Sequence, residues 1–92
     1  MMIARVATFD QLVPEDQRSE AVQLLRDTIR NTPGYLAGFH LHDPKSNKAM
    51  SITVYEDPTA AQAAGKALAE RPDDQKVGLD PDEVEFFQAE PF

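Results

Sequence analysis

The segment between Pro33 and Asp57 constrains the fold of this chain more than any other. It reads as two strands, residues 35–42 and 49–56, joined by a turn-rich connector of Asp, Pro, Ser and Asn residues. Side chains of a strand alternate between its two faces, so antiparallel pairing of these strands sorts their residues into two sets. The segment therefore predicts a β-hairpin with two chemically different faces.

The register of this hairpin follows from pairing Asp43 with Lys48 across a four-residue loop. One face then carries only apolar cross-strand pairs, namely Leu41 with Met50, Phe39 with Ile52 and Ala37 with Val54. The other face is partly polar and pairs His42 with Ala49, His40 with Ser51, Gly38 with Thr53 and Leu36 with Tyr55. A shift of one residue would mix the two sets, which supports this register.

The rest of the chain supplies two more strands and two helices. Strands are predicted at residues 2–9 and 83–89 from their Ile, Val and Phe content. Pro14 and the carboxylates after it open a helix that ends at residues 31–34, and a second helix begins at Asp57 and ends before Pro72. The order β-α-β-β-α-β predicts one ferredoxin-like α+β domain over residues 1–92, with an antiparallel four-stranded sheet and both helices on one face.

The charge of Arg5 suggests which face the helices cover. Burying an arginine in a helix–sheet core without a partner is costly, so we expect Met2, Ala4 and Val6 to lie under the helices with the apolar set of the hairpin. The opposite, open face then carries Ile3, Arg5, Phe9, Leu36, His40, Ser51, Thr53 and Tyr55.

An open sheet face that bears several apolar side chains marks an interaction surface. We therefore expect two copies of the chain to pack face to face as a homodimer, with a pocket for a small molecule between their half-polar faces. The last strand leaves two alternatives: either Val84 and Phe86 or Glu85 and Phe87 face the helices. The polar loop 71–81 is a candidate lid.

The composition disfavours several classes of function. The net charge is −7, from 16 acidic and 9 basic residues, which argues against nucleic acid and anionic membrane surfaces because both are bound through clustered Lys and Arg. The absence of cysteine excludes disulfides, thiolate nucleophiles and cysteine-ligated metals. No apolar run approaches the roughly 18 residues of a membrane span, and the N-terminus lacks a signal-peptide layout, so a cytoplasmic protein is expected.

The succession of these elements resembles the dimeric α/β-barrel superfamily, and within it the antibiotic-biosynthesis-monooxygenase-like domains. The resemblance covers nearly the whole chain. It rests on a helix, a Pro-Gly-Tyr turn at residues 33–35, a strand, an Asp-Pro turn at residues 43–44, the strand 50–57 and an Ala-rich helix. It implies a dimer in which two sheets form a barrel with an internal cavity. Some members oxygenate aromatic polyketides with molecular oxygen and no prosthetic group, relatives degrade haem, and many have no assigned activity.

The residues that these relatives use are only partly present in this chain. The haem-degrading relatives use a Trp with an Asn and a His, and the polyketide oxygenases commonly place Trp and Asn in the cavity. This chain has no Trp, and its two asparagines, Asn31 and Asn47, are predicted in loops. A candidate site must therefore be built from other polar residues of the half-polar face.

On that face His40 is the candidate general base, because histidine exchanges protons near neutral pH. It would remove a proton from an acidic phenol or an activated C–H, while Arg5 holds the resulting oxyanion and Tyr55 orients it. Oxygen could then react with the electron-rich anion without a metal or another cofactor. Further contacts to the substrate are expected from Phe9, Leu36, His42, Ser51 and Thr53.

The same residues also have purely structural alternatives. These are a hydrogen bond of His40 with Ser51, a solvated rim position for His42, an ion pair of Arg5 with Glu85, Glu56 or a carboxylate of a partner subunit, and packing for Tyr55 and Phe9. The His-x-His pair supplies only two ligands, which is too few for a protein metal site, so no metal is expected.

The sequence thus favours a homodimeric, cofactor-independent monooxygenase-like protein that acts on a small aromatic molecule. One alternative is a non-catalytic dimer that binds a small hydrophobic ligand. The other is a dimerisation module whose barrel is filled by large side chains. A nitrogen of His40 that faces a void within reach of Arg5 would favour the catalytic hypothesis over the first alternative.

Overall fold

The computed structural model describes residues 1–10, 15–70 and 81–92, with side chains described throughout except at residues 15–22. The elements along the chain are β1 (Met2–Phe9), α1 (Glu15–Arg30), β2 (Tyr35–Asp43), β3 (Lys48–Tyr55), α2 (Pro58–Ala69) and β4 (Glu83–Ala89). This order confirms the predicted β-α-β-β-α-β arrangement. The candidate lid lies, apart from Pro81, outside the described residues. In the described part of the chain, no helix is long and apolar enough to cross a membrane.

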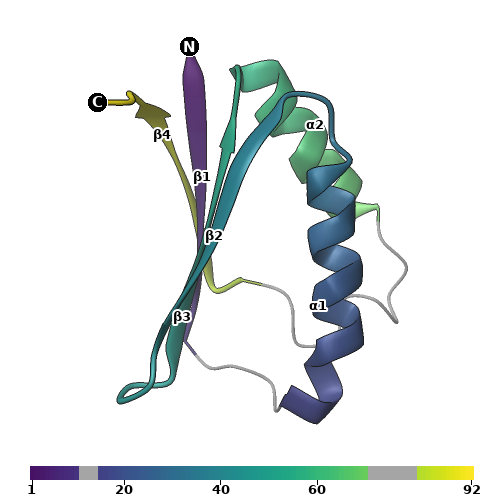
Figure 1. Ribbon diagram of the computed structural model, residues 1–92, viewed down its shortest axis with the longest axis vertical. Coiled ribbons are helices and arrows are strands. Elements are labelled where there is room, and N and C mark those ends of the chain that lie inside the picture. Colours follow the sequence, from purple (N-terminus) through teal and green to yellow (C-terminus); the bar gives the residue numbers. More distant parts are fainter. Residues whose placement is uncertain (11–14, 71–80) are drawn as a thin grey trace.

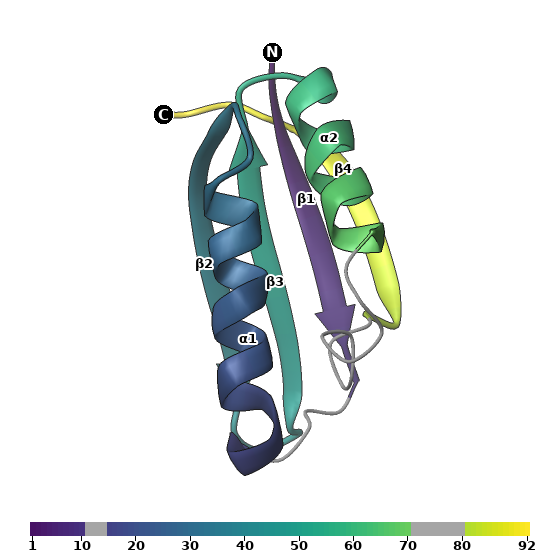
Figure 2. The same cartoon turned by 90° about the vertical axis from the view of Figure 1, so that its right-hand side faces the viewer.

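The four strands form one antiparallel sheet in the order β2-β3-β1-β4. Both helices lie on the same side of this sheet, α1 in front of β2 and β3 and α2 in front of β1 (Figures 1 and 2). The end of the sheet that carries the β2–β3 turn diverges from α1 (Figure 1). α1 packs chiefly against α2. The fold is therefore the predicted ferredoxin-like α+β fold, with one face of the sheet under the helices and the other open.

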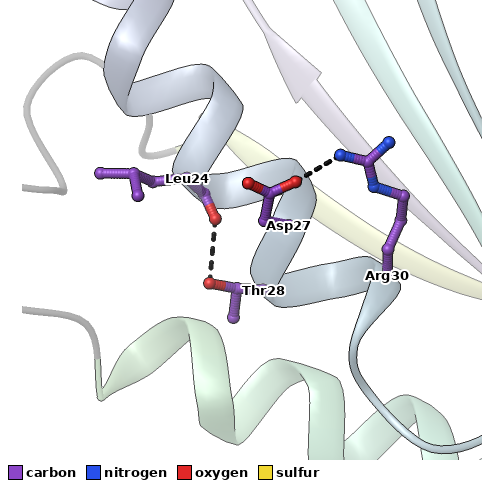
Figure 3. Close-up of polar contacts among 4 residues, drawn as sticks. All are labelled: Leu24, Asp27, Thr28 and Arg30. Carbon is purple, nitrogen blue, oxygen red and sulfur yellow. Dashed lines mark hydrogen bonds and ion pairs between the residues drawn. The ribbon is translucent and has the colours of Figure 1, made fainter.

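Hydrogen bonds close the C-terminal end of α1. Thr28 Oγ1 donates to the carbonyl of Leu24 at 3.0 Å, and Arg30 forms an ion pair with Asp27 (Figure 3). Arg30 lies in the last turn, where the helix dipole favours a cation, whereas an ion pair this exposed adds little stability. Thr32 Oγ1 donates to the carbonyl of Thr28 at 3.1 Å, so the turn toward β2 begins directly at the end of the helix.

The Asp-Pro pair before α2 starts that helix as predicted. Asp57 is the N-cap residue, and its Oδ1 accepts a hydrogen bond from the backbone N–H of Ala60 at 2.8 Å. Pro58 occupies the first turn, where a missing N–H leaves no bond unmade.

The register of the β2–β3 hairpin is confirmed between residues 37 and 54, including the pair of Asp43 with Lys48. Asn47 closes the turn with a φ of 59°, in the left-handed region that Asn tolerates better than most residues. At the open end of the hairpin a β-bulge separates Tyr35 from Ala37, so that Tyr35 pairs with Tyr55. The predicted pairing of Leu36 with that tyrosine is wrong, because the extra residue in β2 shifts the ladder by one.

The helices cover the half-polar face, and the predicted assignment of the two faces is wrong. Tyr55 is completely buried and packs with Ile3 against the alanines of α2, namely Ala60, Ala61 and Ala64. The apolar set lies on the open side, where Phe39 is 62% exposed and Leu41 is 46% exposed. A pocket enclosed between the half-polar faces of two copies is therefore excluded, since the chain's own helices cover that face.

Size and partial exposure explain why the faces are reversed. The buried residues of α2 are Leu68 and three alanines, and the alanines leave space between helix and sheet that a large side chain such as Tyr55 fills. Arg5 does lie on the helix-facing side, but it is only partly buried. Arg5 therefore keeps part of its contact with solvent and avoids the full desolvation cost on which the prediction relied.

The pairing of β4 decides between the two alternatives for the last strand. Arg5 pairs with Phe86 and Ala7 pairs with Val84, so Val84 and Phe86 are on the helix-facing side. Glu85 pairs with Val6 and lies on the open side. This placement argues against Glu85 as the ion-pair partner of Arg5.

Asp43 stabilises the tip of the hairpin, which gives a first testable prediction. Its carboxylate accepts hydrogen bonds from the backbone N–H of Lys45 and from the hydroxyl of Ser46, both at 2.9 Å, and these bonds lower the pKa of Asp43 below its ordinary value. The contribution to turn stability is present above the unfolded-state pKa and is lost as the pH falls through the lower folded-state value. We expect an NMR titration to show Asp43 titrating below an ordinary exposed aspartate, and Ser46→Ala to move its pKa upward. An unchanged titration in Ser46→Ala would contradict this account.

Candidate functional site

The helix-facing side of the sheet arranges its side chains in four cross-strand rows. In order from the open end of the hairpin, where the bulge lies, to the hairpin turn, they are Tyr35–Tyr55–Ile3–Gln88, Gly38–Thr53–Arg5–Phe86, His40–Ser51–Ala7–Val84 and His42–Ala49–Phe9. Successive rows are two residues apart on each strand, which corresponds to roughly 7 Å, except on β2, where the bulge places Gly38 three residues after Tyr35. We number these rows first to fourth below.

Seven of the eight predicted site residues share this face of the sheet. They are Arg5, Phe9, His40, His42, Ser51, Thr53 and Tyr55. Leu36 is the exception, because it lies at the β-bulge and is 49% exposed. The predicted set is thus brought together by strand alternation, but under the helices of the same chain.

The first row forms the buried end of the site. The ring of Tyr35 packs edge-on against Tyr55, with ring centroids 6.4 Å apart and planes at 74°. Tyr35 also reaches over the second row, since a Cβ added at Gly38 would lie 2.8 Å from the Tyr35 hydroxyl oxygen. Gly38 therefore makes room for this ring, and Tyr35 forms one wall beside Thr53.

Two hydroxyl groups at this end are buried without a hydrogen bond. Thr53 is 5% exposed and Tyr55 is fully buried, and neither Thr53 Oγ1 nor the Tyr55 hydroxyl has a partner among the residues that the structure describes. Leaving a buried hydroxyl unpaired costs about 1–3 kcal/mol. Unpaired groups of this kind are uncommon in native proteins and call for a specific explanation.

Charged and titratable groups occupy the second and third rows. Arg5, on β1, lies directly opposite Thr53 of β3 in the second row. His40, on β2 at the other side of β3, lies opposite Ser51 in the third row. Strand spacings of about 4.8 Å place the Cα atoms of Arg5 and His40 roughly 12 Å apart. Their two side chains can span this distance or bind a ligand between them. Neither residue is isolated, because each takes part in an interaction within the chain.

The β4 side of these two rows is open to solvent. Phe86 and Val84 both lie on the helix-facing side, yet they are 56% and 37% exposed. His40 is also exposed. The polar residues therefore form a strip that is buried at Tyr55 and accessible at Arg5 and His40. We call this set the polar strip, and it consists of the six residues Arg5, Tyr35, His40, Ser51, Thr53 and Tyr55.

The fourth row lies apart from the buried end. His42 is four residues beyond Gly38 on β2, roughly 13 Å away at strand spacing. Its Nε2 lies 3.3 Å from Asn47 Oδ1, so its hydrogen bond is local to the hairpin turn. Within the described residues, no group of three or more His, Cys, Asp or Glu could hold a metal ion.

Sequence reasoning missed Tyr35 and the exposure of Phe86. A signal for Tyr35 was present, because a glycine inside a strand, here Gly38, often marks a place where another group approaches the backbone closely. The bulge that puts Tyr35 on this face has no comparable signature in the sequence. The position of Phe86 was one of two alternatives that only the pairing of β4 with β1 distinguishes.

Comparison with known proteins supports the fold. No protein-family model and no curated protein sequence matches the chain. Among solved structures, a mutant form of SnoaB, a cofactor-independent oxygenase from Streptomyces nogalater, is 18% identical with a TM-score of 0.74, over 99% of this chain and 95% of that one. A provisionally assigned antibiotic biosynthesis monooxygenase from Chloroflexus aurantiacus is 17% identical with a TM-score of 0.68, over 100% and 96%.

A haem-degrading protein from Mycobacterium tuberculosis has the same fold. It is 18% identical with a TM-score of 0.60, over 96% of this chain and 93% of that one. The chain thus has the ferredoxin-like fold of the antibiotic-biosynthesis-monooxygenase-like proteins, as the sequence predicted. Proteins of this fold differ in the reactions that their names describe, so the function has to be argued from the polar strip.

Proposed function

We propose that this protein is a cofactor-independent monooxygenase-like enzyme that acts on a small aromatic molecule bound at the polar strip of each subunit. The observation that carries the proposal is that His40, Arg5 and two buried hydroxyls lie together on the helix-facing side of the sheet. The structural similarity to a cofactor-independent oxygenase supports the type of chemistry.

In the proposed reaction His40 acts as the general base. Its imidazole takes a proton from a phenol or from a C–H next to an aromatic ketone, and Arg5 stabilises the negative charge that develops on the substrate oxygen. The resulting electron-rich anion reacts with O₂ directly. One oxygen atom enters the product as a carbonyl and the other leaves as water. The water takes up the two hydrogens that the substrate loses, which are one O–H and one C–H hydrogen of a phenol, or both C–H hydrogens of the carbon next to an aromatic ketone.

The exposure of His40, Phe86 and Val84 in the second and third rows fits this assignment. The substrate must enter from solvent, and the exposed Phe86 and Val84 mark the accessible side of the strip. The buried first row, with Tyr35 and Tyr55, offers aromatic surface against which a planar ring can stack.

Oxygen uptake with a panel of polycyclic phenols and aryl ketones tests the proposal. We expect the purified protein, after treatment with a chelator, to consume oxygen with at least one compound and to place a single ¹⁸O atom from ¹⁸O₂ in the product. Binding without oxygen uptake would instead support the non-catalytic alternative, which the two unpaired hydroxyls also favour. Activity that disappears with the chelator and returns with metal would refute the cofactor-independent mechanism.

We further propose that the open face of the sheet is the interface of a homodimer. This face carries apolar side chains on all four strands, and Phe39 and Phe87 are at least half exposed there. Four strands of about eight residues form a face of roughly 19 by 26 Å. Two such faces together bury on the order of 1,000 Å², which is near the lower limit for a specific interface. The dimer would therefore form on the side opposite the polar strip.

A charge on the open face should dissociate this dimer. We expect the wild-type protein to sediment as a dimer at micromolar concentration and Phe39→Glu to sediment as a monomer, because a carboxylate that is buried in an apolar interface is costly to desolvate. Gln62→Glu is the matched control, since Gln62 is exposed on α2 and the same charge is added there. A monomeric wild-type protein, or a dimer that survives Phe39→Glu, would overturn this assignment.

A further inference from the structure

The hydroxyls of Thr53 and Tyr55 are the strongest unexplained feature of the molecule. Both lie on β3, two residues apart, so their side chains point to the same side of the sheet in adjacent rows. Both are more than nine-tenths buried, and neither has a hydrogen-bond partner in the described part of the chain. Each hydroxyl can donate one hydrogen bond and accept two, so the pair retains its whole capacity for a ligand.

The residues next to Tyr55 are apolar, and the residue opposite Thr53 is cationic. Tyr55 contacts Ile3 and the alanines of α2, and its ring meets the edge of Tyr35. Thr53 lies directly opposite Arg5. Hydrogen-bond donors between apolar walls and next to a guanidinium match a flat apolar molecule with an oxygen substituent, and they do not match a cationic ligand.

We propose that Thr53 and Tyr55 bind the oxygen substituent of the ligand and so select phenols and aryl ketones over aromatic molecules without oxygen. This inference rests on the proposed function and deepens it by assigning the residues that read the substrate. A site built to hydrogen-bond an oxygen rejects a molecule that lacks one, because its buried hydroxyls then stay unpaired. The unpaired hydroxyls thus destabilise the free protein and are satisfied when the ligand binds.

A pair of isosteric variants tests this role against a purely structural one. Thr53→Val and Tyr55→Phe each remove a hydroxyl and nearly preserve volume. The probes are 1-naphthol and naphthalene, which differ by one hydroxyl, with affinities measured by equilibrium dialysis. We expect each variant to bind 1-naphthol roughly 5- to 30-fold more weakly than wild type and to bind naphthalene within about twofold of wild type. The melting temperature of the free variants should be unchanged or higher, because an unpaired buried group has been removed.

Thr32→Val is the matched control. Thr32 is also buried, at 8% exposed, but its hydroxyl donates to the carbonyl of Thr28 at 3.1 Å. Removing this satisfied hydroxyl should lower the melting temperature and leave the affinity for 1-naphthol unchanged. Removal of an unpaired hydroxyl should thus weaken binding without lowering the melting temperature, whereas removal of the paired hydroxyl should lower the melting temperature without weakening binding.

Several outcomes would overturn the inference. The first is that the wild-type protein and both variants bind 1-naphthol equally well. The second is that the variants lose the same affinity for 1-naphthol as for naphthalene. The third is that the wild-type protein does not bind 1-naphthol more tightly than naphthalene. Lower melting temperatures with unchanged affinity would show that the hydroxyls serve the free protein, for example by holding water. The affinities are measured independently of oxygen uptake, so selective binding without turnover would refute the proposed catalysis and leave this inference standing. If oxygen uptake is measured separately, turnover that is unaffected in both variants would support the catalysis and overturn this inference.

Discussion

His40→Ala should abolish oxygen uptake and leave the fold intact. A positioned general base contributes about 10²- to 10⁴-fold to a rate, so we expect a loss of at least a hundredfold in kcat/KM with whichever phenol or aryl ketone the wild-type protein turns over. The side chain of His40 is exposed, so its removal should cost little stability. Oxygen consumption measures the activity, and circular dichroism with a thermal melt checks the fold.

His42→Ala provides the matched control for this experiment. His42 lies on the same strand and the same face, two residues further along, and its Nε2 is near Asn47 at the hairpin turn. It is far from the buried hydroxyls, so its loss should change the rate by no more than about twofold on the scale of exposed surface substitutions. Added imidazole should restore part of the activity of His40→Ala. Equal losses in the two variants, or an unchanged rate in His40→Ala, would remove His40 as the base.

Gly34→Ala should strongly destabilise the fold. Gly34 has a φ of +88°, and a Cβ placed there would lie 2.5 Å from the Cβ of Ala60. The left-handed conformation costs a non-glycine residue about 1–2 kcal/mol, and overpacking adds about 1–3 kcal/mol. The backbone cannot shift freely, because the Gly34 carbonyl accepts a hydrogen bond from the N–H of Glu56 at 2.8 Å.

We therefore expect Gly34→Ala to lower the free energy of unfolding by roughly 2–4 kcal/mol, a large share of the 5–14 kcal/mol typical for a chain of this length. Urea denaturation at fixed protein concentration measures the change, since stability of an oligomer depends on concentration. The control is Gly65→Ala, because Gly65 lies inside α2 with nothing within 4 Å of an added Cβ. This helical substitution should stabilise the protein by about 0.5–1 kcal/mol. A cost below about 1 kcal/mol for Gly34→Ala would contradict the argument.

The sequence alone determined the order of the elements and most of the hairpin register. Both follow from local signals that survive in any tertiary context: the Asp-Pro start of α2, the Pro-Gly turn before β2, and the alternation that pairs Phe39 with Ile52. The grouping of Arg5, His40, Thr53 and Tyr55 on one face was predictable for the same reason, since strand alternation and register together fix which residues point the same way.

Only the tertiary structure decided which of the two faces the helices cover. A right-handed crossover determines on which side of a sheet the helices lie, but it does not say which alternate set of side chains points to that side. That choice depended on how the small residues of α2 complement Tyr55 and Ile3, and on the partial exposure of Arg5. The bulge at Leu36 and the packing of Tyr35 over Gly38 are likewise products of packing between distant segments, so no local pattern could reveal them.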